Sequence, residues 1–129
     1  IEALPANIPF VFDPTPVISD IPRSILSRVL ARTTWLSCNT MEAAEIAGLG
    51  NVEAVAARLL VDHCPRAAGV VIRAGAKGCH IRLADGSAQT IAGFKVNAVD
   101  TNGAGDTHIG AFVSALAHGI SPFEAARYA

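Results

Sequence analysis

The chain has 129 residues, enough for one domain with a hydrophobic core, and its formal net charge is −1. This near-neutral balance, with Lys and Arg scattered along the sequence, excludes nucleic acid and an anionic membrane surface as expected partners. Hydrophobic residues make up 51% and charged residues 16%. No run approaches the roughly 20 apolar residues of a membrane-spanning helix. The apolar excess therefore indicates either a sheet covered on both faces or a piece whose surface is covered by more protein.

The two ends of the sequence and its cysteines indicate whether the chain is a fragment and whether disulfides are expected. The sequence opens on Ile1 and stops at Ala129 inside a helical pattern, so we interpret it as a fragment. Cys38, Cys64 and Cys79 form an odd set without a C-x-x-C pair. A disulfide framework is therefore not expected, the thiols are expected to be small core residues, and a cytoplasmic location is predicted.

The first half of the chain predicts two strands and three helices. Residues 8–12 and 35–38 are short apolar runs typical of buried strands, and the first is closed by an Asp-Pro-Thr-Pro turn over 13–16. Helical spacing covers residues 24–31. Two further helices are predicted, one capped by Asn39 and ended by Gly48, the other capped by Asn51.

The second half begins with an apolar run over 68–72, as expected of a central parallel strand. Residues 79–83 and 88–91 flank Asp85-Gly86, which predicts an antiparallel hairpin. Apolar residues at helical spacing predict a helix over 104–118. Strands alternating with helices indicate a three-layer α/β fold, with a mostly parallel sheet and helices on both faces.

The last helix is predicted from its start signals. Pro122 occupies the first helical position, and Ser121 with Glu124 has the spacing of a capping box.

The most informative segment is 99–107, which reads Val-Asp-Thr-Asn-Gly-Ala-Gly-Asp-Thr and enters the predicted helix. The amides of Gly103, Ala104 and Gly105 can approach an anion at a helix N-terminus, where the dipole favours negative charge. Asp106 is placed to accept a hydroxyl proton, as phosphoryl transfer requires. The alternative is a glycine-rich loop whose Asp only supports the start of the helix.

Other nucleotide and metal motifs are absent. A dinucleotide fingerprint would need Gly where His108 stands, and the Gly-Ala-Lys-Gly segment over 75–78 does not fit a P-loop. The four histidines lack ligand spacing and are expected at the surface or at helix ends; they are His63, His80, His108 and His118.

Three stretches together resemble the PfkB, or ribokinase-like, family of sugar and nucleoside kinases. Residues 100–107 match every defined position of the D-T-x-G-A-G-D signature, residues 39–42 are similar to the N-x-x-E motif, and residues 70–78 resemble the nucleotide-side strand and glycine turn. The resemblance implies that residues 1–129 are the C-terminal portion of a ribokinase-like domain. The N-terminal part that recognises substrate and carries the lid, and the extreme C-terminus, are then missing.

The resemblance also implies a role for each matching residue. Asp106 would be the catalytic base, and Gly103, Ala104 and Gly105 the anion hole for the γ-phosphate. Asn39 and Glu42 would hold Mg²⁺ indirectly, through its waters, near the ATP phosphates. Asp100 would bind a monovalent cation such as K⁺. The nucleotide cleft would be lined by Arg73, Gly75 and Gly78.

Local alternatives stand beside these roles. Asn39 with Glu42 is a capping box by itself, and Gly75 with Gly78 fits an ordinary turn. Arg73 replaces the Thr often found in the family and either touches a phosphate or points to solvent. The Asp13-Pro14 segment lacks the Asn and Arg of a D-P-N-x-R-like pattern, so no catalytic role is assigned to it.

The expected function is ATP-dependent phosphorylation of a sugar, nucleoside or related alcohol, with Asp106 as base. The fragment alone is expected to be inactive, and the full-length protein is compatible with a homodimer. Two alternatives remain: a non-catalytic nucleotide- or anion-binding module, such as a degenerate kinase, and an unrelated Rossmann-like domain that would bind a dinucleotide at the end of its first strand.

Overall fold

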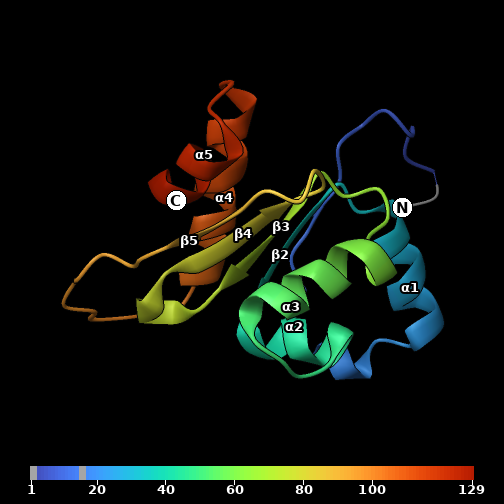
Figure 1. Cartoon of the computed structure of the whole chain (residues 1–129), viewed down its shortest axis with the longest axis horizontal. Coiled ribbons are helices and arrows are strands. Elements are labelled where there is room, and N and C mark those ends of the chain that lie inside the picture. Colours follow the sequence, from blue (N-terminus) through green and yellow to red (C-terminus); the bar gives the residue numbers. More distant parts are fainter. Residues whose placement is uncertain (1–2, 15–16) are drawn as a thin grey trace.

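A computed structural model describes residues 3–14 and 17–129. Its centre is a five-stranded sheet in the order β1-β2-β3-β4-β5 (Figure 1). The strands are β1 (Val11–Phe12), β2 (Trp35–Asn39), β3 (Gly69–Arg73), β4 (Cys79–Leu83) and β5 (Ala88–Ile91). The first three are parallel, whereas β4 is antiparallel to both β3 and β5. The predicted α/β sheet with an antiparallel hairpin is therefore confirmed, and the hairpin extends the sheet beyond β3.

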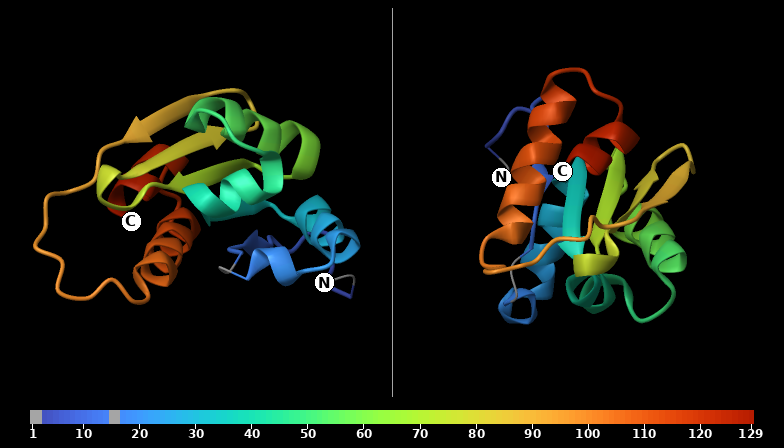
Figure 2. Two further views of the ribbon diagram at one scale, coloured as in Figure 1. Left: turned by 90° about the horizontal axis from the view of Figure 1, so that it is seen from below. Right: turned by 90° about the vertical axis from the view of Figure 1, so that its left-hand side faces the viewer.

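Helices cover both faces of this sheet (Figure 2). One face carries α1 (Arg23–Arg32), α2 (Thr40–Ala47) and α3 (Val52–Arg58), which continues as a π-helical turn over Leu59–His63. A 3₁₀ turn, η1 (Ile18–Asp20), precedes α1. The apolar faces of these helices are packed on the sheet: Leu26, Leu30, Ile46, Val55 and Leu59 are buried against Leu36, Val70 and Ile72.

The opposite face carries α4 (Ala104–Ala117) and α5 (Pro122–Tyr128). Phe112 of α4 is 1% exposed and packs edge-on against Trp35, with the ring centroids 5.0 Å apart. Burying a side chain of this size stabilises the fold by about 1.5–3 kcal/mol. This contact fixes α4 over the sheet and so determines where its N-terminus lies.

Two predictions about local structure are wrong. The Ser121 hydroxyl donates to the Glu124 carboxylate at 2.6 Å and accepts no backbone N–H, so this pair forms no capping box. His80 was expected at the surface or at a helix end, but it lies in β4 with its side chain in the interior and is 3% exposed. His118 does lie at the helix end, as predicted. Residues 15 and 16 of the predicted turn lie outside the described residues.

The three cysteines are buried and free, as predicted. Burial raises the pKa of the Cys64 thiol to about 12, and it also raises the pKa of Cys38 and Cys79. These thiols are therefore protonated and act as small apolar side chains.

Over residues 3–14 and 17–129, no helix has the length and apolar character needed to cross a membrane.

Candidate active site

The carboxyl ends of the three parallel strands meet at one edge of the sheet. Asp13 follows β1, Asn39 ends β2 and Arg73 ends β3, where it is the register partner of Asn39. Ligands of open α/β sheets bind at this edge because loops and helix N-termini converge there. The edge therefore brings together polar residues that are up to 60 positions apart in the sequence.

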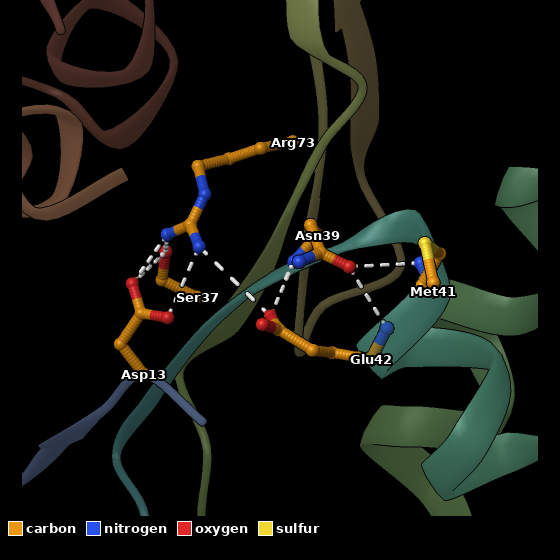
Figure 3. Close-up of polar contacts among 6 residues, drawn as sticks. All are labelled: Asp13, Ser37, Asn39, Met41, Glu42 and Arg73. Carbon is orange, nitrogen blue, oxygen red and sulfur yellow. Dashed lines mark hydrogen bonds and ion pairs between the residues drawn. The ribbon is translucent and has the colours of Figure 1, made fainter. Parts of the chain in front are cut away.

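Arg73 forms a two-point ion pair with Asp13 (Figure 3). Its Nη1 contacts Oδ2, and its Nη2 donates to Oδ1 at 3.0 Å; Nη1 also donates to the Ser37 hydroxyl. The Arg73 and Asp13 side chains are only 14% and 21% exposed. Burial lowers the pKa of Arg73, but the contact with Asp13 raises it, with a net shift upward. The alternative that Arg73 points to solvent is therefore excluded.

Glu42 occupies the other side of the same guanidinium. Its Oε2 accepts the Asn39 backbone N–H at 2.8 Å and lies 3.9 Å from Arg73 Nη2. The Asn39 side chain accepts the amides of Met41 and Glu42 at 2.9 Å, which confirms the capping box. Glu42 is 4% exposed, and burial raises its pKa against the lowering effect of the Asn39 N–H. Its Oε1 accepts no hydrogen bond from the described part of the chain and remains available to a ligand.

The N-terminus of α4 carries the predicted anion-binding amides and the predicted base. Gly103 adopts a left-handed conformation (φ 72°) and caps the helix, and its carbonyl accepts the Thr107 amide at 2.9 Å. The Ala104 amide donates to the Thr101 carbonyl at 3.2 Å, so it is not a free donor. The amides of Gly103 and Gly105 make no such turn bond within the described residues. Asp106 is exposed in the first turn, beside them.

Gly105 joins this helix terminus to the strand ends. Its φ is not positive, so backbone conformation does not require glycine there. A Cβ at this position would lie 3.3 Å from Arg73 Nη2 and 3.4 Å from its Cζ. Glycine therefore lets α4 approach the guanidinium closely, and the Arg73 side chain lies against the first turn of the helix.

The remaining predicted residues lie in two loops. Asp100 is exposed on the segment 92–103, which extends away from the sheet before α4 (Figure 2), and its Oδ1 accepts the Asn102 amide at 2.9 Å. Gly75 begins a 3₁₀ turn after β3. Gly78 has φ 95°, and a Cβ there would lie 1.9 Å from the Ile91 carbonyl oxygen. Gly78 is thus required by the packing of this turn against the end of β5.

Two residues near the site were assigned no function from the sequence: Asp13, and His108, which was expected at the surface or at a helix end. Asp13 was given no role because its motif is incomplete, although an acidic residue directly after a buried strand was the available signal. His108 lies one turn beyond Gly105, and its Nδ1 is buried with no hydrogen-bond partner among the described residues. Burial is the main cause that lowers the pKa of His108; the charge of Arg73 lowers this pKa further, whereas the charge of Asp13 raises it. Both side chains are therefore part of the electrostatic environment of Arg73.

A cavity of about 560 Å³ lies elsewhere, between α1 and the N-terminal segment. None of the predicted site residues lines it. Its wall is formed by Leu4, Ala6, Ile25, Arg28, Val29, Ala31, Arg32 and Arg66.

Known proteins share both the sequence pattern and the fold. The sequence model of the pfkB family carbohydrate kinases matches residues 6–129. A ribokinase of Schizosaccharomyces pombe is 44% identical over 73 residues, and an uncharacterized sugar kinase of Escherichia coli is 33% identical over 121 residues. These alignments cover 57% and 93% of this chain, but only 22% and 37% of the two relatives.

Solved structures of ribokinases share the fold of this chain. Ribokinase from Thermotoga maritima superimposes with a TM-score of 0.78 at 29% identity, over 93% of this chain and 39% of its own. Arabidopsis thaliana ribokinase, in a complex with ribose and ATP, gives 0.77 at 25% identity over 93% and 38% of the two chains. The present chain therefore spans well under half the length of the relatives it matches. It belongs to the pfkB family of carbohydrate kinases.

Proposed function

We propose that the protein containing this chain transfers the γ-phosphoryl group of ATP to a hydroxyl of a sugar or nucleoside. The observation that carries the proposal is the meeting of a helix N-terminus, an exposed carboxylate and a guanidinium at one sheet edge. The relatives support the substrate class. One neighbour is a ribokinase bound to ribose and ATP, and another is a nucleoside kinase of Burkholderia thailandensis bound to inosine, with a TM-score of 0.74.

Asp106 is the proposed catalytic base. Its carboxylate would accept the proton of the attacking hydroxyl as the oxygen bonds to phosphorus and the bond to the ADP oxygen breaks. A loose phosphoryl transition state needs alignment and charge stabilisation more than a strong base. The amides of Gly103 and Gly105 and the dipole of α4 would stabilise the negative charge on the transferred group.

Ala104 enters this role only with a conformational change. Its amide donates to Thr101 in the structure, and it would join the anion hole after that 3.2 Å bond opens. The proposed anion hole therefore consists of two amides that can donate at once, those of Gly103 and Gly105, and of the Ala104 amide, which must first leave Thr101.

The strand ends fit a nucleotide with a hydrated divalent cation. Mg²⁺ keeps several waters and prefers carboxylate oxygen, and Glu42 presents one such oxygen that accepts no hydrogen bond from the part of the chain that the structure describes. When bound, Mg²⁺ would neutralise phosphate charge and orient the ATP. Asn39 and Glu42 would hold its waters, with Arg73, Gly75 and Gly78 on the nucleotide side. Asp100 is proposed as one ligand of a monovalent cation such as K⁺.

The test is Asp106→Asn in the intact protein, assayed with ATP, Mg²⁺ and a panel of sugars and nucleosides. Removing a general base lowers kcat by about 10²–10⁴-fold, while the dissociation constant of ATP is expected to stay the same. Asp62→Asn, at an exposed acid in the π-helical turn, is the matched control and should retain full activity. An Asp106→Asn protein with unchanged kcat would remove Asp106 from the mechanism.

A further inference from the structure

Arg73, at the end of β3, is surrounded by groups from the segment after β1, from β2, from α2 and from α4. We name Asp13, Ser37, Glu42 and Arg73 the Arg73 cluster (Figure 3). It contains two carboxylates and one guanidinium. The position of that guanidinium therefore depends on how strongly each of the two acids attracts it.

The contacts show an unequal division. Asp13 engages both terminal nitrogens of Arg73, the geometry that gives guanidinium–carboxylate pairs their strength and direction. Glu42 lies 3.9 Å away, within ion-pair range but too far for a hydrogen bond. Asp13 thus holds Arg73 at the β1 side, and within the described residues the second oxygen of Glu42 has no hydrogen-bond donor.

The electrostatics of α4 make this restraint necessary. The guanidinium lies against Gly105 at the N-terminus of a 14-residue helix, where the dipole is positive. Two positive centres in contact repel each other, and the Asp13 carboxylate offsets that repulsion. Without it, the guanidinium would be driven from the helix toward the nearest remaining acid, Glu42.

We propose that Asp13 is a positioning residue for phosphoryl transfer. By holding Arg73, it keeps the Glu42 carboxylate open to a hydrated Mg²⁺ and keeps the first turn of α4 in place. The inference rests on the proposed kinase function, and it assigns Asp13 an indirect role in which it touches neither substrate nor metal.

The experiment compares Asp13→Asn with Asp13→Glu and with Asp20→Asn, a control at an exposed acid of η1, in the intact protein. Asp13→Asn should raise the Mg²⁺ concentration for half-maximal rate about tenfold, because the freed guanidinium competes for Glu42. It should lower kcat by up to about 100-fold, the cost of a 1 Å misplacement. Asp13→Glu should restore part of both effects, and the control should change neither.

A second variant separates positioning from folding. Asp13→Asn combined with Arg73→Gln removes both charges, so no unpaired ion remains buried and nothing can clamp Glu42. The double variant should regain the wild-type Mg²⁺ dependence while kcat stays low. Additive effects of the two substitutions on Mg²⁺ dependence would overturn the proposal, since residues acting through one another are not additive.

Two readouts are independent of turnover. In the metal-free protein, Asp13→Asn should shift the amide resonances of Glu42 and Gly105, and Asp20→Asn should not. Calorimetric titration with ADP should show that Mg²⁺ strengthens ADP binding in the wild type and much less in Asp13→Asn. If the wild type phosphorylates no sugar or nucleoside, the proposed function fails. The amide resonances and the ADP titration still test whether Asp13 positions Arg73. Unshifted resonances or an unchanged Mg²⁺ effect would refute its positioning role.

Discussion

The two halves of the sheet use their polar residues differently. The parallel half, β1 to β3, directs its carboxyl ends to one edge, where Asp13, Ser37 and Arg73 meet from separate strands. The antiparallel half, β4 and β5, pairs neighbouring segments, and its buried polar contact is local: His80 Nδ1 to the Thr90 hydroxyl at 2.9 Å. Parallel topology gathers distant side chains into a site, whereas the side-chain contact of the hairpin joins neighbouring strands and leaves the buried His80 Nε2 without a partner among the described residues.

This contrast predicts that substitutions in the hairpin half act on stability and those at the parallel edge act on catalysis. Gly78→Ala should give the largest effect on stability. Its Cβ would meet the Ile91 carbonyl oxygen at 1.9 Å, and φ 95° adds strain. The expected loss is more than about 3 kcal/mol of unfolding free energy, from strain and overpacking together, measured by urea denaturation of the intact protein.

Gly86→Ala is the matched control for that loss. Gly86 has φ 90° but open space around its Cβ, so only the strain of about 1–2 kcal/mol is expected. Equal losses at the two positions would show that the turn at Gly78 is not packed against β5.

The buried histidine of the hairpin predicts a dependence of stability on pH. Burial is the main cause that lowers the pKa of His80 below 6.5; Arg82 lowers it further and Glu53 opposes this. Between the folded and unfolded pKa values, the unfolded state binds more protons, so stability is lost as pH falls below about 6.5. The slope is at most about 1.4 kcal/mol per pH unit for one proton.

Urea denaturation of the wild type and His80→Gln across about pH 5–7.5 checks this expectation. The substitution should flatten part of the pH dependence, and His108 should contribute in the same direction, because burial lowers its pKa too. An unchanged slope in His80→Gln would contradict the prediction.

The smallest effect on stability is expected at the parallel edge. Gly110→Ala lies in open space within α4 and should stabilise the protein by up to about 1 kcal/mol through helix propensity. Gly105→Ala has the same propensity gain, but its Cβ would press on Arg73 at 3.3 Å. Its net change in stability should be near zero, whereas kcat should fall clearly below that of Gly110→Ala. Equal kcat values for the two variants would contradict the contrast between the halves.

Local pattern was sufficient for most of the elements. Asn39 and Glu42 lie three residues apart, so their capping box depends only on the chain next to them, and the sequence predicted it correctly. The same signals failed for Ser121 and Glu124. A hydroxyl can donate or accept, and here it donates to the carboxylate at 2.6 Å. Spacing shows which groups can meet, but not which of them donates.

By itself, the sequence determined the order of strands and helices, the hairpin and the placement of Gly103 and Asp106 at a helix start, since each depends on neighbours within a few residues. Only the tertiary structure decided that Asp13 holds Arg73, that Gly105 faces the guanidinium and that the Ala104 amide is already bonded. The physical reason is range: parallel strands unite residues 60 positions apart, and no local preference encodes that distance.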